Sequence, residues 1–381
     1  MDRTTSIELL RELIDLKGSG SAFLDDKPTR SPADRYGDLQ FQRERERIFR
    51  RHPLVAAHAS ELAEPNSFLT RSIADLPVLL TRDKTGQVRA FLNVCRHRGA
   101  RLVHEERGCR SAFSCPYHAW TYRNTGQLRA IPHEKQGFPG IDKASRGLRE
   151  LPVAERLGFI WIVGTPGADG RFDENFAALE DELAWLDLEN HGIAATADLD
   201  CAANWKLLVE GGIEAYHFKV THRNTIGPHF MDNLSSYRAF GRHLRSILPR
   251  ESVAGLAEAP EAEWDIRTHA NVLYSLFPNT QLLVMQDHIA WIWMTPVSAA
   301  QTRLRIATLA PASEINAGQA EHWERNQAIT MTTLAEDFTI GESIQAGLSS
   351  GANEDLLFGR FEGALETFNG LVDAALAEDP A

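Results

Sequence analysis

Two short Cys–His pairs carry the clearest chemistry in the sequence. Cys95 and His97 form the first pair, and Cys115 and His118 form the second. Two thiolates and two imidazoles are the ligands of a [2Fe–2S] cluster in which two Cys bind one iron and two His bind the other. Zinc also accepts two Cys and two His, so the ligand count alone does not exclude a zinc site. It also does not exclude that the four residues are core or loop residues that bind no metal. Zinc fingers usually pair Cys with Cys and His with His, whereas each pair here supplies one ligand of each kind. We therefore predict the iron–sulfur cluster.

A second group of candidate ligands lies further along the chain. His217 and His222 follow Glu210 and Glu214 within one segment. The two histidines are five positions apart, which is not the one-face spacing of a regular helix. A shared metal would therefore require a helix end or a bulge between them. On residue chemistry alone, a chance pair of surface or core histidines explains this segment as well as a metal site does.

The composition indicates an ordinary globular protein. The chain has 381 residues, of which 43% are hydrophobic and 24% charged, and this length is enough for two domains. Its net charge of −12 disfavours nucleic acid and anionic membranes, so we expect neither as a partner. There is no apolar run near the roughly 18 residues of a membrane span, and the N-terminus lacks a signal-peptide core. We expect a cytoplasmic protein, in which Cys109 and Cys201 are loop or core residues rather than a disulfide.

The first half of the chain predicts short helices followed by short strands. Thr5 and Glu8 have the spacing of a capping box, which predicts a helix that ends at residues 18–20. Residues 41–49 predict a second helix with a solvated charged face. Further on, residues 77–80 and 88–92 predict two strands, because the turn residues 83–86 lie between them.

The second half predicts a sheet with helices. Residues 172–186 have helical periodicity, residues 281–285 and 290–294 resemble strands, and the chain is helical from about residue 317 to 334 and beyond. This mixture predicts an α+β protein.

Three motifs give the chain a resemblance to a known family. NVCRHRGARL (residues 93–102), CPYHAWTY (115–122) and NWKLLVEGGIEAYHFKVTH (204–222) resemble motifs of the α subunits of Rieske non-haem iron ring-hydroxylating oxygenases. The resemblance extends from about residue 41 to 368. Residues 1–40 precede it as the N-terminal helical segment. The resemblance implies an all-β Rieske [2Fe–2S] domain (41–165) and a helix-grip catalytic domain (166–381), in which helices pack on an antiparallel sheet.

The resemblance also implies a mononuclear non-haem Fe(II) site. It identifies His217 and His222 as two of the ligands and takes the third, a carboxylate, from a later helix. Asp337 is our choice, while Glu336 and Asp355 are the competing acids. Two His and one carboxylate leave coordination positions open for substrate and O₂.

Glu214 stands where many family members carry Asp. In the family this acid bridges the cluster of one subunit to the iron of its neighbour, which implies a homo-oligomer, namely a ring-shaped trimer. Glu at this position is found in branches that act on quaternary ammonium compounds, although a conservative exchange without meaning for the substrate explains it equally well.

The implied function is that of a terminal oxygenase. It would use O₂ and electrons from a separate NAD(P)H-dependent flavin and iron–sulfur reductase, directly or through a ferredoxin, since the chain lacks a G-x-G-x-x-G fingerprint. The substrate would be a small aromatic compound or a quaternary or N-methyl amine, which is hydroxylated or dealkylated. The alternative is a Rieske electron-transfer protein without oxygenation chemistry. Candidate pocket residues, each equally explained as core, are Asn204, Phe218, Phe230, Leu282, Met285 and Trp293.

Overall fold

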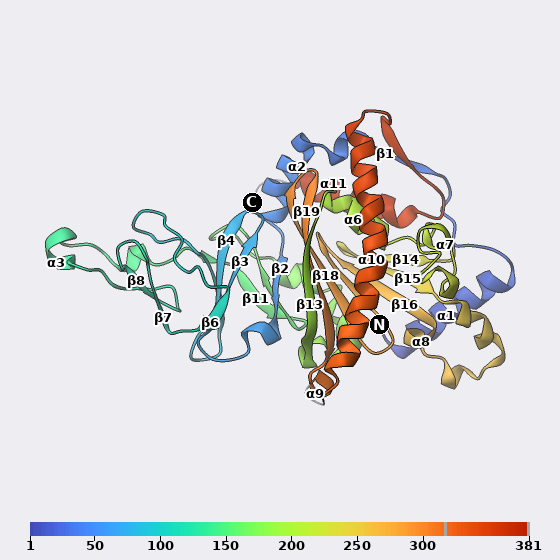
Figure 1. Cartoon of the computed structure of the whole chain (residues 1–381), viewed down its shortest axis with the longest axis horizontal. Coiled ribbons are helices and arrows are strands. Elements are labelled where there is room, and N and C mark those ends of the chain that lie inside the picture. Colours follow the sequence, from blue (N-terminus) through green and yellow to red (C-terminus); the bar gives the residue numbers. More distant parts are fainter. Residues whose placement is uncertain (316–317, 379–381) are drawn as a thin grey trace. The chain divides into compact units, whose positions relative to one another are not determined.

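The computed structural model describes residues 1–315 and 318–378, which form two compact units (Figure 1). One unit combines residues 1–48 with the chain from residue 173 onward, and the other comprises residues 49–172. The two units divide after residues 48 and 172, whereas the sequence predicted domain boundaries at 40 and 165. The N-terminal segment therefore belongs to the same compact unit as the C-terminal half. The end of the expected third domain, at residue 381, falls outside the described residues.

The unit of residues 49–172 is built from three antiparallel sheets, with strand orders β10-β5-β4-β3-β6, β11-β12-β2 and β7-β8-β9. Its core packs Phe68, Phe91 and Phe113 against Trp120 and Tyr122. The expected all-β domain is confirmed. Its strands are β2 Leu54–His58, β3 Ser67–Ile73, β4 Leu76–Arg82, β5 Val88–Leu92, β6 Arg107–Cys109, β7 Ala112–Ser114, β8 Thr121–Arg123, β9 Leu128–Ala130, β10 Glu150–Leu151, β11 Val153–Arg156 and β12 Phe159–Ile162.

The predicted turn between β4 and β5 is also confirmed. The Asp83 carboxylate accepts hydrogen bonds from the backbone N–H groups of Thr85 (2.8 Å) and Gln87 (3.2 Å). Gly86 has a φ of +87°, which glycine adopts without steric cost. These contacts fix the register with which β4 pairs β5.

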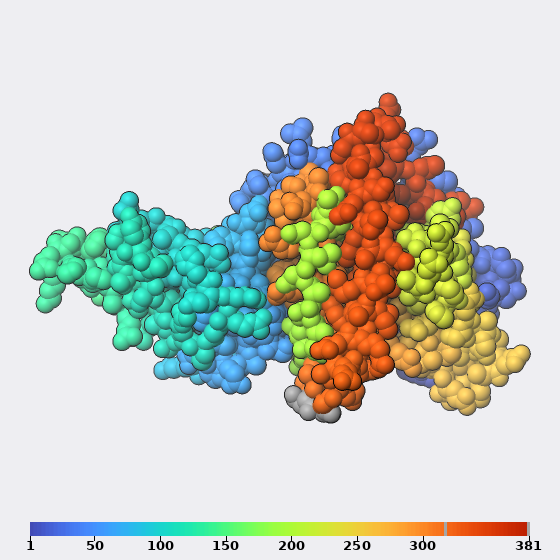
Figure 2. Space-filling view, viewed as in Figure 1, coloured from blue at the N-terminus to red at the C-terminus, as the bar shows by residue number. Residues whose placement is uncertain are grey.

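The other unit contains a seven-stranded antiparallel sheet with the order β13-β19-β18-β17-β16-β15-β14. Helix α6 (Trp205–Gly212) packs on it, and the long helix α10 (Ala320–Ser349) crosses β13 and β19 (Figure 1). Figure 2 shows α10 as a ridge along this side of the unit. The strands are β13 His191–Cys201, β14 Ser236–Phe240, β15 His243–Pro249, β16 Ala270–Leu276, β17 Thr280–Val284, β18 Ile289–Ser298 and β19 Gln301–Pro311. Helices packed on an antiparallel sheet are what the α+β prediction required.

The two faces of this sheet have different neighbours. On one face, Ser246 and Gln281 donate to carbonyl oxygens in and just after α6 (3.1 and 3.0 Å), and Thr308 donates to a side chain of α10 (2.7 Å). On the opposite face, Tyr274 donates to Glu182 (2.9 Å), which lies on the short helix α5 (Glu180–Leu183). Because side chains alternate along a strand, the register assigns each strand residue to the helix-covered face or to the other face.

The first helix begins earlier than the sequence predicted. Helix α1 spans Arg3–Gly18, and its N-cap is Asp2, whose carboxylate accepts from the backbone N–H of Thr5 at 2.7 Å. The capping box at Thr5 and Glu8 is therefore wrong. An Asp at the N-cap satisfies a free backbone N–H and also interacts favourably with the helix dipole, so the earlier start is favoured. The predicted end at residues 18–20 is correct.

Two other predicted helices are interrupted. Residues 172–186 form α4 (Phe172–Phe176), α5 (Glu180–Leu183) and a 3₁₀ turn. Residues 41–49 comprise the end of α2 (Asp38–Glu44) and a π turn (Arg45–Phe49). The predicted late helix corresponds to α10, while its expected start at residue 317 lies outside the described part. The remaining elements that matter below are β1 Thr29–Pro32, η1 Ala33–Tyr36, α7 Phe218–Thr221, η7 Gly227–His229, η8 Glu251–Glu258, α8 Ile266–His269, β20 Asp355–Phe358, which pairs with β1, and α11 Gly363–Ala377.

A buried polar network joins the N-terminal segment to α6 and α11. Lys206 and Glu44 form an ion pair at 2.6 Å with both side chains fully buried. Glu210 accepts from the Tyr36 hydroxyl (2.9 Å) and from the Asn369 amide (2.8 Å), and burial raises the pKa of Glu210 to about 7. Buried charges and polar groups are tolerated only when paired, so this network explains why residues 1–48 pack with the later unit.

None of the helices in residues 1–315 and 318–378 is both long and apolar enough to cross a membrane.

Candidate metal centres

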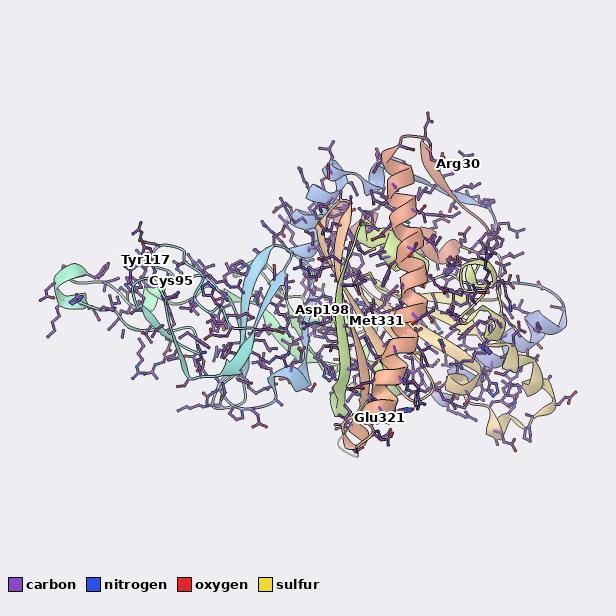
Figure 3. The ribbon with its side chains drawn as sticks, in the orientation of Figure 1. Arg30, Cys95, Tyr117, Asp198, Glu321 and Met331 are labelled. Carbon is purple, nitrogen blue, oxygen red and sulfur yellow. The ribbon has the colours of Figure 1, made fainter. Side chains whose placement is uncertain are left out.

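The two Cys–His pairs lie in loops of similar construction in the unit of residues 49–172. In the first loop, the Gly99 N–H donates to the Cys95 carbonyl (3.0 Å), and in the second the Ala119 N–H donates to the Cys115 carbonyl (2.9 Å). Gly99 and Ala119 both have positive φ, +82° and +54°. Each loop thus turns tightly directly after its cysteine. Figure 3 labels Cys95 in one loop and Tyr117 in the other, and the Arg98 guanidinium of the first loop donates to the Tyr117 hydroxyl at 3.0 Å.

The four predicted ligands come together at these loop tips. The Nδ1 atoms of His97 and His118 face each other at 3.1 Å, and both imidazoles are half-buried. Cys95 and Cys115 lie deeper, at 2% and 3% exposure. Trp120 stacks on the His97 ring with centroids 4.8 Å apart and fixes its orientation. The sulfurs are therefore on the interior side and the imidazoles on the outer side.

This arrangement fits a cluster with two irons better than a single zinc ion. A tetrahedral zinc would need all four ligand atoms around one point, within its bond lengths of about 2.0–2.3 Å. Among the residues that the structure describes, one set of three His, Cys, Asp or Glu ligand atoms lies within 4.8 Å, and it is not this one. A layer of thiolates and a layer of imidazoles provide one pair of ligands for each iron.

The one set that does converge consists of His217, His222 and Asp337. His217 lies at the N-cap and His222 at the C-cap of the single-turn helix α7, which solves the problem of their five-residue spacing. Their Nε2 atoms are 3.2 Å apart. Asp337, in the middle of α10, brings Oδ1 to 3.3 Å and 3.0 Å from these two nitrogens. The helix end that the spacing required is thus present.

The charges at this point suit a bound cation. Burial alone would lower the pKa of His217, but hydrogen bonds with Asp337 and Glu214 outweigh it and raise that pKa to about 10. Burial would also raise the pKa of Asp337, yet the two imidazoles lower it. The donor set is that of a facial triad of two His and one carboxylate, which suits non-haem iron.

Two further carboxylates hold the imidazoles from behind. Glu214 accepts from His217 Nδ1 and from the backbone N–H of Tyr216. Glu336 accepts from His222 Nδ1 at 2.7 Å and from the Thr225 hydroxyl at 2.6 Å. Each Nδ1 is thereby fixed as the donor, which leaves Nε2 free for a metal.

The structure separates the three acids that competed for the third ligand position. Asp337 points to both Nε2 atoms, whereas Glu336 contacts the far nitrogen of His222. Asp355 lies on β20 and pairs with Arg30 at 2.9 Å. The geometry therefore favours Asp337 as the ligand and gives Glu336 the role of orienting His222.

Of the six candidate pocket residues, Phe218 and Phe230 lie nearest the triad. The Phe218 ring packs against His222 (centroids 5.4 Å) and against Phe230 (5.8 Å). Asn204 instead caps α6 and donates to the Ala299 carbonyl at 2.8 Å, so it is fully used as a structural residue.

The other three candidates are on the sheet. Leu282 pairs with Tyr274 and Trp291, and Trp293 lies two positions beyond Trp291, so both side chains are on the face opposite α6 and α10. They cannot line a pocket at the triad, and this part of the prediction is wrong. Met285 follows β17 at the far end of the helix-covered face, where its carbonyl accepts from Arg267 (2.7 Å).

A cavity of about 400 Å³ opens beside the triad between α6, α10, β20 and α11. His217 and Asp337 line it together with the carboxylates of Glu210, Glu214 and Glu362. The rest of its wall is mostly apolar and includes the exposed side chains Tyr216, Ile340, Ile344 and Leu357. Sequence reasoning missed these apolar residues. The sequence pattern that could have indicated them is the apolar series Ile340, Ile344 and Leu348. These residues are four positions apart and follow Asp337 on the same helix.

Two families match the chain in separate segments. The family described as "Ring hydroxylating alpha subunit (catalytic domain)" matches residues 188–378. The Rieske [2Fe–2S] domain matches residues 52–152. The first segment contains the His217, His222 and Asp337 triad, and the second contains both Cys–His pairs.

Curated relatives align with about half of their own length. The large subunit of anthranilate 1,2-dioxygenase from Acinetobacter baylyi is 31% identical over 248 residues, which is 63% of this chain and 52% of that protein. The oxygenase subunit of carnitine monooxygenase from Acinetobacter pittii is 33% identical over 51% of each chain. The oxygenase subunit of glycine betaine monooxygenase from Pseudomonas aeruginosa is 34% identical over 61% of this chain and 52% of that protein.

Solved structures share the fold over nearly the whole chain. A quaternary ammonium Rieske monooxygenase in complex with L-carnitine superposes with a TM-score of 0.76, at 23% identity, over 92% of this chain and 96% of that one. A naphthalene 1,2-dioxygenase from Rhodococcus superposes with a TM-score of 0.74, at 20% identity, over 98% of each chain. At these identities the likeness shows the fold.

Proposed function

Because this chain belongs to the family of ring-hydroxylating α subunits, we propose that it is the terminal oxygenase of a multicomponent Rieske system. It takes electrons from a separate NAD(P)H-dependent reductase and uses O₂ to hydroxylate or oxidatively dealkylate a small organic substrate. The observation that carries this proposal is the convergence of His217, His222 and Asp337 within 4.8 Å, in a unit separate from the Cys–His loops. A Rieske electron carrier needs only the Cys–His loops and not the triad. A cytoplasmic location is proposed with it, since the reductase draws on NAD(P)H.

Each residue has a defined part in this proposal. Cys95, His97, Cys115 and His118 hold the [2Fe–2S] cluster, and His217, His222 and Asp337 hold the mononuclear iron. When bound, the cluster supplies electrons one at a time and the iron supplies O₂ activation. Glu214 and Glu336 keep the histidine Nδ1 protons in place, so that both Nε2 atoms stay available to the metal.

The reaction balances with the electrons that the reductase delivers. In a monooxygenation, one atom of O₂ replaces the hydrogen of a C–H bond with a hydroxyl group, and the other leaves as water with two electrons and two protons. If the hydroxylated carbon carries nitrogen, the C–N bond then breaks to give an amine and a carbonyl compound. The relatives named for anthranilate, carnitine and glycine betaine support two substrate classes, aromatic compounds and quaternary or N-methyl amines.

We expect the anaerobically purified protein to contain about three irons per chain, two in a cluster and one mononuclear. With a reductase, NADH and O₂, at least one member of a panel of aromatic acids and quaternary ammonium compounds should give a product whose new oxygen derives from ¹⁸O₂. Cys115→Ala should lose both the Rieske paramagnetic spectrum and this product. About two irons per chain and no product from any compound would favour the electron carrier instead.

The surfaces also support a homo-oligomer, for which we propose a ring-shaped trimer. The cluster loops expose Tyr117 next to His118, together with the positive side chains of Arg98 and Arg101. The cavity at the triad is acidic and apolar. Because these two surfaces differ, a contact between them is head-to-tail, and head-to-tail contacts form a ring when the rotation between copies closes. Electrons would then pass from the cluster of one copy to the iron of the next.

Two inactive variants are expected to restore activity to each other. Cys115→Ala removes the cluster, and His217→Ala removes an iron ligand, so each variant alone should be inactive. When both are expressed together, a mixed ring places an intact cluster next to an intact iron site in a neighbouring copy. Product formation by the purified mixed oligomer, but not by separately purified oligomers mixed without subunit exchange, is the expected result. A fully active monomer, or no activity in the mixed oligomer, would exclude transfer between copies.

A further inference from the structure

Arg250 is a half-buried arginine directly after β15 that has no acidic partner in the part of the chain that the structure describes. Its Nη2 donates to the Asn271 amide oxygen at 2.8 Å, and its guanidinium carbon lies 5.3 Å from the centroid of the Phe230 ring. Within the described residues it forms no ion pair. The more deeply buried Arg245 of the same unit, by contrast, is neutralised by Glu182 at 2.6 Å.

The free hydrogen-bonding capacity of this guanidinium is large. Nε is buried without a hydrogen-bond partner, and Nη1 forms no hydrogen bond to any described residue. Burial lowers the pKa of Arg250, and among residues 1–315 and 318–378 no carboxylate offsets this effect. Arginine nevertheless stays protonated in proteins, so this site holds a partly desolvated positive charge. Such a charge is costly unless an anion pairs with it.

Arg250 lies on the face of the sheet that carries the metal triad. Ser246 of β15 points to the helix-covered face, since its hydroxyl donates to a carbonyl just after α6. Leu248 and Arg250 follow at alternating positions, and Leu248 pairs with Asn271, the residue that holds the Arg250 side chain. Arg250 therefore extends the same face beyond the end of the strand.

A row of aromatic contacts connects this arginine to an iron ligand. His222 packs against Phe218 (centroids 5.4 Å), Phe218 packs edge-to-face against Phe230 (5.8 Å), and Phe230 lies under the guanidinium. Phe230 and Arg250 are also joined by an isolated antiparallel bridge. A row of packed aromatic rings thus runs from the iron ligand His222 to Arg250, which pairs with no acid among the described residues.

We propose that Arg250 binds the carboxylate of the substrate and that the substrate is therefore a small organic acid. Its apolar or aromatic part would lie along Phe218 and Phe230, with the carbon to be oxidised at the triad end. A guanidinium matches the geometry of a carboxylate and forms charge-assisted hydrogen bonds with it. A single guanidinium balances a single negative charge, which favours a monocarboxylate. The position of the reacting carbon rests on the proposed function, whereas the binding of a carboxylate by Arg250 does not.

Binding to the metal-loaded protein tests the proposal without turnover. Calorimetry would compare benzoate with benzamide, and glycine betaine with choline, because each pair differs in its carboxylate. Arg250→Met should weaken binding of the tighter carboxylate probe by about ten- to a hundredfold, as expected for a lost hydrogen bond between charged groups. The amide or alcohol partner should bind equally to both proteins. Arg250→Lys keeps the positive charge but not the planar pair of N–H donors, so its loss of affinity for the carboxylate should be intermediate.

Arg238→Met is the matched control. The Arg238 guanidinium also lies over a phenylalanine ring, 5.1 Å from Phe240, but on the exposed edge strand β14. This variant should bind both carboxylates like the unmodified protein. Equal carboxylate binding by Arg250→Met, Arg250→Lys and the unmodified protein would overturn the proposal, as would no binding of either carboxylate by the unmodified protein. If carboxylate binding depends on Arg250 but no substrate is oxidised, the proposed function fails and the binding site stands.

Discussion

Asp337→Ala is expected to abolish product formation while the reduced protein keeps its cluster spectrum. Asp337 supplies the only carboxylate oxygen that lies near both Nε2 atoms, at 3.3 Å from His217 and 3.0 Å from His222, among the described residues. Two imidazoles alone bind iron weakly, since a facial triad needs its anionic ligand. The cluster loops belong to the other compact unit, so their spectrum should not change. Iron analysis should show about one iron fewer per chain than in the unmodified protein.

Glu336→Ala is the control, because it removes the neighbouring acid on the same helix. Its carboxylate contacts His222 Nδ1 and the Thr225 hydroxyl, not the converging nitrogens. It should therefore retain iron with an affinity lowered by about ten- to a hundredfold, which is typical of lost outer contacts to a metal ligand. If Asp337→Ala keeps its iron and activity while Glu336→Ala loses both, then Glu336 and not Asp337 is the third ligand.

The cluster could be predicted from the sequence because its ligands lie in two short local motifs. Cys95-x-His97 and Cys115-x-x-His118 place each thiolate and imidazole within one tight loop, so the ligand set does not depend on distant packing. The triad is different. The spacing of His217 and His222 contradicts a regular helix, and only the single turn of α7 between them brings both nitrogens together. The five-residue spacing shows that a shared metal would need a helix end between the two histidines. The resemblance to the family was needed to identify them as ligands.

The choice among Asp337, Glu336 and Asp355 depends on helix rotation. Consecutive residues of a helix point about 100° apart, since a turn takes 3.6 residues. The interior face of α10 is marked by Phe338 and Gly341, but the sequence does not say where on that face the histidines lie. The resemblance and the packing of α10 on the sheet together favour Asp337.

The pocket could not be predicted well because it depends on strand register. A shift by one residue moves every side chain of a strand to the opposite face. Leu282 and Trp293 are apolar and lie in correctly predicted strands, yet the register places them away from the helices. Arg250 was overlooked for a related reason. Only the bridge to Phe230 and the contact with Asn271 show that this charge is held on the helix-covered face.

Glu214→Gln is expected to keep both metals and to lower turnover by about ten- to a hundredfold, as for other outer partners of metal-bound histidines. Glu214 is not a ligand, so iron content and the cluster spectrum should be unchanged. One of its oxygens accepts from His217 Nδ1, and the other accepts from the Tyr216 N–H. Glutamine replaces one of these acceptors with an NH₂ group, which cannot accept a hydrogen bond from either donor.

In the proposed ring, the same carboxylate would accept from a second imidazole. Glu214 lines the acidic cavity at the triad. In the cluster loops the Nδ1 atoms of His97 and His118 face each other, so the Nε2 atom of each ring points away from the other ring. A neighbouring copy of that ring would dock in the cavity, and its His118 Nε2–H would donate to Glu214, because each carboxylate oxygen has two lone pairs. Glu214 would then join the two metal sites through hydrogen bonds.

Single-turnover measurements separate this role from a general effect of charge. In Glu214→Gln, reoxidation of the reduced cluster by O₂ and substrate should slow as much as product formation does. Glu362→Gln removes another carboxylate from the same cavity, but Glu362 accepts from the Gly359 backbone N–H and not from His217, so its turnover should be largely kept. Glu214→Asp should also slow transfer, because a side chain shorter by one methylene withdraws from His217 Nδ1. Unchanged product formation and unchanged cluster reoxidation in Glu214→Gln would show that electrons reach the iron by another route.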